Sequence, residues 1–245
     1  MIGFNFEGKT VLVTGSTQGI GLDIAKSFVE CGAKVFVHGS GNMEKAKKAQ
    51  AEIGAYGAVV ANLSNMDEAA SLPEKTGKVD ILVLNASVQI RNDWEKITFD
   101  EFDMQVNVNY KSTLLLMQKY YPAMKEQGFG RIITIGSVQQ VMPHKQMAVY
   151  ASTKSAVVNL VHNIAKQVAP EGITVNNIAP GTILTPRNEG VLSNPEYRAK
   201  CLADIPVGFF GECPDISGTV LLVASEYGRF ITGQDILIDG GASLR

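Results

Sequence analysis

The sequence of 245 residues is poor in cysteine and histidine and has no long apolar run. Its three cysteines, Cys31, Cys201 and Cys213, are odd in number and form no C-x-x-C pair, so neither a disulfide framework nor a zinc knuckle is indicated and we expect a cytoplasmic protein. No two histidines are four residues apart, which excludes a helix-borne histidine pair for a metal. No apolar run approaches the roughly 18 residues that span a bilayer, so we expect no membrane partner.

Basic charge is not in excess either, because 22 Lys and Arg residues stand against 24 Asp and Glu and give a net charge of −2. Proteins that bind nucleic acids neutralise phosphates with cationic side chains. We therefore expect a small-molecule ligand and no nucleic-acid partner. No linker, charge block or repeat of about 20–50 residues interrupts the chain, so we expect a single domain over residues 1–245.

Short β-branched runs alternate with longer segments of helical spacing. The runs are nearly continuous in Val, Ile and Leu, which is typical of parallel strands covered by helices on both faces. The sequence therefore predicts an α/β fold with a doubly wound, mostly parallel, seven-stranded sheet. The predicted strands are residues 10–14, 34–38, 58–61, 80–85, 131–135, 173–178 and 235–238.

One stretch departs from this alternation. Residues 180–215 carry five prolines among mixed polar residues. Long connections of this kind in compact domains often cover a ligand site and move. We expect residues 182–215 to form a mobile substrate segment.

A glycine-rich turn follows the first predicted strand and leads into a helix near Ile20. Glycine lets the backbone approach a phosphate, whose charge is met by the free N–H groups of a helix start. The spacing differs from G-x-G-x-x-G, and a plain strand-to-helix turn stays open, but the first such turn of a parallel sheet is where dinucleotides bind. The candidate residues are Gly15, Ser16, Gln18, Gly19, Ile20 and Gly21.

The end of the second predicted strand indicates which dinucleotide is bound. Folds that bind NAD usually place an acid there, and this chain has Gly39 and Ser40, with no acid before Glu44. A 2′-phosphate is then not repelled, and Ser40, Asn42 and His38 could donate hydrogen bonds to it. The sequence favours NADP on this ground, and NAD stays open because no arginine accompanies these residues.

Two pairs of tyrosine and lysine have the four-residue spacing that puts them on one helix face: Tyr150 with Lys154 and Tyr121 with Lys125. Ser137 decides between them, because it follows a predicted strand at its carboxyl end, where open α/β sheets bind ligands, and precedes the first pair. We interpret the second pair as the amphipathic end of a surface helix.

The first pair has the chemistry of an alcohol–ketone interconversion. A free tyrosine titrates near pH 10, and a proton donor works best near the operating pH. An ammonium about 4 Å away is worth about 4 kcal/mol at an effective dielectric near 20, so Lys154 is expected to lower the pKa of Tyr150. Ser137 would hold and polarise the substrate oxygen.

The ordered motifs together resemble the short-chain dehydrogenase/reductases, which have Rossmann-like domains, over the whole chain. The resemblance implies an NAD(P)-dependent oxidoreductase with Asn109, Ser137, Tyr150 and Lys154 as catalytic residues. Asn109 is also, by itself, a poor helix former inside a predicted helix. The implied cofactor-binding residues are Gly15, Ser16, Gln18, Gly19, Ile20, Gly21, Gly39, Ser40, Asn62, Leu63, Asn85, Ala86, Tyr150, Lys154, Pro180, Gly181, Ile183 and Thr185.

Three positions depart from the family pattern. Ser87 stands where members usually have a glycine beside the cofactor, Asn62 replaces an aspartate near the adenine, and Gln18 replaces a basic residue common in members that prefer NADP. Ser87 therefore places a side chain where the family leaves room. Gln18 leaves the choice between NADP and NAD open.

The substrate is expected to be small and polar. Carrier-protein-linked 3-oxoacyl reductases of this family present arginines for an acidic carrier, and the matching positions here are Gly128 and Glu171. We therefore expect a polyol, a sugar or a sugar acid, with a 3-oxoacyl-carrier-protein reductase as the alternative. Many residues near the expected substrate site are polar, and either Arg91 or Arg187 could pair with a carboxylate. The other explanation of these polar residues is that they belong to solvated loops. They are Gln89, Arg91, Asn92, Trp94, Gln139, Gln140, His144, Gln146, Arg187 and Asn188.

Two other classes of protein are alternatives to an oxidoreductase. A non-enzymatic nucleotide sensor would keep the glycine turn and lose the acid–base residues. A hydrolase is excluded because Ser137 is not in a G-x-S-x-G elbow. The family resemblance also implies a homotetramer that pairs the helix of Tyr150, and the sequence leaves open whether Val157, Val158 and Val161 face an interface or the core.

Overall fold

The structure is a computed structural model that describes residues 3–244, and these residues contain one sheet of seven strands. Every neighbouring pair of strands is parallel. The strands are β1 (Thr10–Val13), β2 (Lys34–Gly39), β3 (Gly57–Val60), β4 (Ile81–Leu84), β5 (Gly130–Ile135), β6 (Ile173–Pro180) and β7 (Asp235–Ile238).

The strand order is β3-β2-β1-β4-β5-β6-β7. The chain winds outward from β1 to β3, returns to the other side of β1, and winds outward again from β4 to β7. The direction of winding therefore changes between β1 and β4. In parallel sheets the crevice beyond the carboxyl ends of such neighbouring strands is the usual ligand site. The predicted doubly wound sheet is confirmed, and β6 runs two residues beyond its predicted end.

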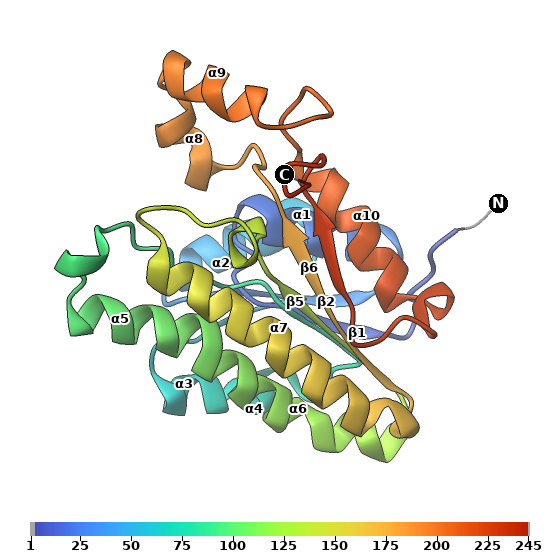
Figure 1. The fold of residues 1–245 in the computed structure, drawn as a ribbon. Helices are drawn as coiled ribbons and strands as arrows, with labels where there is room; N and C mark the ends of the chain where they lie inside the picture. Colours follow the sequence, from blue (N-terminus) through green and yellow to red (C-terminus); the bar gives the residue numbers. More distant parts are fainter. Residues whose placement is uncertain (1–2, 245) are drawn as a thin grey trace.

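Helices cover both faces of the sheet (Figure 1). One face carries α1 and α10, and the other carries α6 and α7. Within residues 3–244 the helices are α1 (Gly19–Glu30), α2 (Met43–Ile53), α3 (Met66–Ala70), α4 (Leu72–Thr76), α5 (Phe99–Val106), α6 (Ser112–Gln127), α7 (Ala148–Val168), α8 (Pro186–Leu192), α9 (Pro195–Ala203) and α10 (Cys213–Ala224).

The core divides into two layers because successive residues of a strand point to opposite faces. In β1, Leu12 packs in the layer of α6 and α7, whereas Val11 and Val13 pack in the layer of α1 and α10. Val157 and Val161 of α7 are buried in the first layer, so they belong to the core. Two-sided burial explains why the strands have few polar residues and could be found from the sequence.

The segment after β6 extends from the carboxyl end of the sheet as α8 and α9 (Figure 1). It returns through a parallel bridge between Ile183 and Gly211. A small apolar cluster of its own supports it, made by Leu192, Ile205 and Phe210 with Ala242 from the end of the chain. This segment therefore stands over the crevice at the switch point. Within the described residues no helix is both long and apolar enough to cross a membrane.

Candidate active site

The switch point between β1 and β4 is closed by a side-chain amide. Asn85, which follows β4, donates from Nδ2 to the backbone oxygens of Thr14 and Gly15 at 2.9 and 3.0 Å. In return the Thr14 hydroxyl accepts from the backbone N–H groups of Asn85 and Ala86, both at 3.0 Å. These bonds fix the start of the glycine turn against the loop after β4.

The turn itself requires glycine at Gly15. Its φ is +63°, and a Cβ there would lie 2.9 Å from Cα of Ala86. The turn delivers the chain to α1, where Gln18 is the N-cap residue. Among the described residues no side chain caps this helix, and its first turn holds no acid. Free N–H groups at a helix start form an anion site, so this geometry fits a phosphate of a dinucleotide.

His38, at the end of β2, is hydrogen-bonded to the glycine turn. Its Nδ1 accepts from the Gly15 N–H at 3.1 Å, and its Nε2 lies 3.1 Å from the oxygen of Ala61. The ring is 1% exposed, and burial lowers its pKa to about 4, so His38 is neutral with the proton on Nε2. Both ring nitrogens are already bonded to the protein. The expectation that His38 donates to a 2′-phosphate is therefore wrong, and its role is to orient Gly15.

Protonation of His38 predicts how stability depends on pH. The unfolded histidine titrates at pH 6.5 and the folded one at about 4, so between these values the unfolded chain takes up a proton that the folded chain does not. Stability is lost as the pH falls, by about 2 kcal/mol between pH 7 and pH 5. Urea unfolding at both pH values should show this loss reduced in His38→Gln and retained in the exposed-site control His162→Gln. An equal loss in wild type and His38→Gln would contradict the assignment.

A cation that the sequence analysis missed lies beyond β2. Lys45, in the first turn of α2, donates from Nζ to the side-chain oxygen of Gln18. The Asn42 side chain caps α2 through its Oδ1, which accepts from the Lys45 N–H at 2.9 Å, and among the described residues Asn42 does not line the cavity described below, so the expectation that it binds a phosphate is not supported. The signal in the sequence was Asn42 as a helix N-cap, because an N-cap at residue 42 places Lys45 in the first turn of the helix that follows β2. Lys45 and Ser40 both line the cavity described below.

Asn109 lies in a π-helical turn, Asn107–Lys111, that interrupts the helix between α5 and α6. Its Oδ1 accepts from the Val88 N–H at 2.8 Å, and its Nδ2 donates to the Val88 oxygen at 2.9 Å and to Thr153 Oγ1 at 3.1 Å. The side chain is buried. Asn109 thus ties the loop after β4 to the helix of Tyr150, and its side-chain amide acts by positioning.

Ser137, Tyr150 and Lys154 come together at the carboxyl end of β5. Ser137 caps a short 3-10 helix directly after the strand. Tyr150 and Lys154 lie one turn apart on α7 and are 5% and 4% exposed. The Lys154 Nζ donates to the oxygen of Ile135 at 2.6 Å and lies 5.6 Å from the centre of the Tyr150 ring. The expected proton donor and its lysine are therefore neighbours, with the serine beside them.

The electrostatics differ from the expectation. Burial raises the pKa of the Tyr150 phenol, and the charge of Arg187 together with contacts to Ser137 and Ser87 offsets part of this rise. Burial, and secondly the charge of Arg187, lowers the pKa of Lys154 to about 7. The sequence predicted that Lys154 alone lowers the pKa of the Tyr150 phenol, and the structure does not support this. The cation that faces Tyr150 most directly is Arg187.

One cavity of about 610 Å³ runs over the switch point and joins the glycine turn to Tyr150. Of the catalytic and cofactor-binding residues expected from the sequence, Ser16, Asn109 and Lys154 do not line it, and the Ser16 hydroxyl instead bonds Val13 and His38 within the turn. The polar residues Asn92, Trp94, Gln140 and Gln146, expected near the substrate, do not line it either. The other expected catalytic and cofactor-binding residues line it. They are Gly15, Gln18, Gly19, Ile20, Gly21, Gly39, Ser40, Asn62, Leu63, Asn85, Ala86, Ser137, Tyr150, Pro180, Gly181, Ile183 and Thr185.

Ser87 has a partner across this cavity. Arg187, at the start of α8, donates from Nη1 to Ser87 Oγ at 3.0 Å and from Nη2 to the Ser87 oxygen at 2.8 Å. The serine that departs from the family's glycine thus bonds an arginine of the segment over the crevice.

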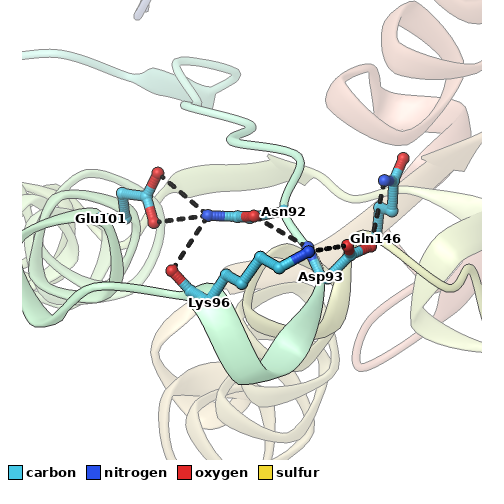
Figure 2. Close-up of polar contacts among 5 residues, drawn as sticks. All are labelled: Asn92, Asp93, Lys96, Glu101 and Gln146. Carbon is cyan, nitrogen blue, oxygen red and sulfur yellow. Dashed lines mark hydrogen bonds and ion pairs between the residues drawn. The ribbon is translucent and has the colours of Figure 1, made fainter.

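A polar cluster fixes the two loops beside the substrate end (Figure 2). Gln146 donates from Nε2 to Asp93 at 3.2 Å, and the backbone oxygen of Gln146 accepts from the Asn92 N–H at 3.1 Å. The Asn92 amide donates to Glu101 at 3.1 Å, and Lys96 pairs with Asp93 at 3.0 Å. The loop that carries Asn92 is therefore fastened to the loop between Ser137 and α7.

The alternative pair, Tyr121 and Lys125, lies at the far end of α6. Lys125 forms an ion pair with Glu171 at 2.7 Å and lies 5.7 Å from the centre of the Tyr121 ring. Neither residue lines the cavity among the described residues. Its interpretation as the end of a surface helix is confirmed.

Known proteins resemble this chain in sequence and fold. The family model described as enoyl-(acyl carrier protein) reductase matches residues 15–243. The 3-oxoacyl-[acyl-carrier-protein] reductase FabG of Staphylococcus aureus is 35% identical over 241 residues, which cover 95% of this chain and 97% of that protein.

Two solved structures are similar over the full chain. One, from Beutenbergia cavernae, is described as an NAD(P)-dependent gluconate 5-dehydrogenase with bound NADP and has 32% identity, a TM-score of 0.92 and 99% coverage of both chains. The other, a 3-oxoacyl (acyl-carrier-protein) reductase from Agrobacterium tumefaciens with NADP bound, has 32% identity and a TM-score of 0.92, and covers 97% of this chain and 95% of its own. With the Ser137, Tyr150 and Lys154 geometry, these matches show that the chain belongs to the short-chain dehydrogenase/reductase family of NAD(P)-dependent oxidoreductases.

Proposed function

We propose that the protein interconverts a secondary alcohol and a ketone on a small polar molecule, a polyol, a sugar or a sugar acid, with NADP as its preferred dinucleotide. The observation that carries this proposal is a single cavity that has Ser137 and Tyr150 at one end and the glycine turn at the other. The bound dinucleotide would supply or accept the hydride at the reacting carbon.

The protein's own groups handle the oxygen and its proton. Ser137 and Tyr150 present two hydroxyls to the substrate oxygen, and these donate hydrogen bonds that polarise a carbonyl. The Tyr150 phenol gives its proton to the oxygen in reduction and takes it back in alcohol oxidation. Lys154 lies behind the phenol and shares that proton, while Asn109 holds the loop and helix in register.

Charge at the adenosine end supports NADP. Lys45 and Ser40 line the cavity after β2, where an NAD-specific fold usually has an acid. Lys45 therefore provides the positive charge that an arginine at the end of β2 would otherwise supply.

Lys45 yields a test of the dinucleotide preference. A charge-assisted bond to a phosphate contributes about 1.5–3 kcal/mol, so Lys45→Glu should weaken NADP binding at least about tenfold while NAD binding changes less. Titration by intrinsic fluorescence gives both dissociation constants. Lys48→Glu on the same helix, outside the cavity, is the matched control for net charge. An equal loss for both dinucleotides, or the same loss in the control, would refute the preference.

The substrate end of the cavity supports a polar substrate. Gln139 lines it, and its side-chain oxygen is buried without a hydrogen-bond partner among the described residues. An unpaired buried acceptor is unfavourable unless a donor reaches it, and a substrate hydroxyl is such a donor. His144 and Asn188 add polar atoms to the same wall.

A 3-oxoacyl-carrier-protein reductase is the second candidate, because the FabG relatives favour it. The expected docking positions for an acidic carrier are Gly128 and Glu171. Glu171 is acidic and already pairs with Lys125, while Lys78 pairs with Glu126 close by. Paired charges provide little steering for an anionic partner. The free small molecule therefore remains the proposal.

An assay of dinucleotide turnover tests this function. Wild type is assayed with NADPH and NADH against hydroxylated ketones, sugar acids and apolar ketones, and a 3-oxoacyl thioester is included. The proposal expects turnover of the hydroxylated compounds. Reduction of apolar ketones alone, or of the thioester alone, would overturn the substrate class. Tight NADP binding without any turnover would point to a nucleotide sensor.

We also propose a single-domain subunit over residues 1–245 whose segment 182–215 moves over the substrate, a homotetramer, and a cytoplasmic location. Exposed aromatic rings on α5, with Phe99 at 87% and Phe102 at 44%, support burial of this helix between subunits. Free thiols at all three cysteines of the described chain support a reducing compartment. Gel filtration with light scattering tests the tetramer.

A further inference from the structure

The substrate end of the cavity contains a guanidinium that the proposed reaction does not use. Arg187 crosses from α8 to Ser87 on the opposite wall, with both terminal nitrogens in hydrogen bonds of 2.8–3.0 Å. These bonds use two of the five N–H donors of the guanidinium. The rest of the fork can therefore donate to an anion while Ser87 holds the group in place.

The position of Arg187 is close to the reacting atoms. Arg187 and Ser87 line the same cavity as Tyr150, and the charge of Arg187 and contacts to both side chains lower the pKa of the Tyr150 phenol. The phenol in turn must contact the oxygen that gains or loses a proton. An anion held by Arg187 is therefore expected close to the reacting carbon, at a spacing of one or two carbon atoms.

The charge of the cavity fits an anionic substrate. Among the described residues, those that line the cavity include Lys45, Arg91 and Arg187 but no Asp or Glu. Lys45 lies at the far, adenosine end, so the two arginines set the sign of the charge at the substrate end. A carboxylate matches a planar guanidinium because two parallel N–H···O bonds form.

The two arginines are not equivalent. Arg91 lies on the loop after β4, and its neighbours are Tyr197 of α9 and His144. It is therefore placed at the rim, between the loops and the segment over the crevice. Arg187 alone of the two faces Tyr150.

We propose that Arg187, held by Ser87, binds the carboxylate of a hydroxy acid whose reacting alcohol is one or two carbons from that carboxylate. This inference rests on the proposed function and narrows it to 2- and 3-hydroxy acids and the matching oxo acids. It also gives a reason for the side chain at position 87, because a glycine there could not hold Arg187 through a hydroxyl.

Paired substrates test the proposal. Wild type, Arg187→Gln, Arg187→Lys and Arg91→Gln are assayed in the oxidation direction with 2- and 3-hydroxy acids, with the primary amides of the same acids, and with an acid whose alcohol is five carbons from the carboxylate. Wild type should prefer each short acid to its amide. Arg187→Gln should lower kcat/KM for the acids at least about tenfold more than for the amides, mainly through KM. Arg187→Lys should regain part of the difference, and Arg91→Gln should change acid and amide alike.

Calorimetric binding of the same acids and amides, with NADP present, separates the inference from the proposed function. Tighter binding of the short acids than of the amides, lost in Arg187→Gln, supports the inference even if no compound is turned over, and that lack of turnover would defeat the proposed function alone. Turnover of polyols with no preference for acids would overturn the inference alone. A loss that is equal for acids and amides, a loss confined to NADP binding, or a preference for the distant carboxylate would also overturn it.

Discussion

Replacing Tyr150 by phenylalanine is expected to lower kcat about a thousandfold in both directions of the reaction. The substitution keeps the buried ring of this α7 residue and removes only the hydroxyl that exchanges the proton. The binding of NADP and of the substrate should change much less, because their other contacts remain. The measurement is kcat and KM under saturating dinucleotide, together with the dissociation constant of NADP.

Tyr121→Phe is the matched control for this substitution. Tyr121 has the same four-residue spacing to a lysine, but its helix end lies outside the cavity among the described residues. We expect a rate close to wild type for this variant. Equal rates for Tyr150→Phe and wild type would refute the role of the phenol. Comparable losses in the two variants would show that ring substitution at either pair disturbs the fold.

Most of the fold could be predicted from the sequence because each central strand is buried on both faces. Val11, Leu12 and Val13 must all be apolar when one layer contacts α1 and α10 and the other contacts α6 and α7. A run of this kind stands out from the helical spacing around it. The end of β6 was harder to predict, since Ala179 and Pro180 continue the strand without any β-branched side chain.

The site could be predicted from the sequence at positions where the local geometry requires one residue type. Gly15 and Asn85 are such residues. The backbone of Ala86 leaves no room for a side chain at Gly15, and the Asn85 amide is needed to donate to the Gly15 oxygen across the switch point. His38 was not, because a histidine at a strand end can face a ligand or the protein, and only the bonds to Gly15 and Ala61 decide between them.

The pKa values of the Tyr150–Lys154 pair could not be obtained from spacing. A four-residue spacing gives the distance between two charged groups, but it does not give their burial or the third charge beside them. Burial shifts the pKa of the phenol upward and that of the ammonium downward, and Arg187 lies 33 residues after Lys154 in the sequence. The protonation of the pair is therefore set by burial and by Arg187, and not by one of its own charges acting on the other.

The proton that we propose Tyr150 and Lys154 to share determines the expected pH dependence of alcohol oxidation. Since the pKa of Lys154 is lowered to about 7 and that of Tyr150 is raised above 10, the pair loses its first proton as the pH rises through about 7. Above that pH the pair has room for one proton and can accept it from the alcohol through the phenol. The oxidation rate of wild type should therefore increase through about pH 7 and level off above it.

Lys154→Met should remove this increase near neutral pH. Without the lysine, only the buried phenol can be deprotonated, and its pKa is raised above the ordinary value of 10. The rise in oxidation rate should move above pH 10, and kcat at pH 8 should fall at least about a hundredfold, since the phenolate fraction falls tenfold for each unit between the pH and the pKa. Lys125→Met, at the other tyrosine–lysine pair, should keep the wild-type profile. An unshifted profile in Lys154→Met would mean that the proton titrating near pH 7 belongs to another group, and the loss of rate would then report only the missing bond to Ile135.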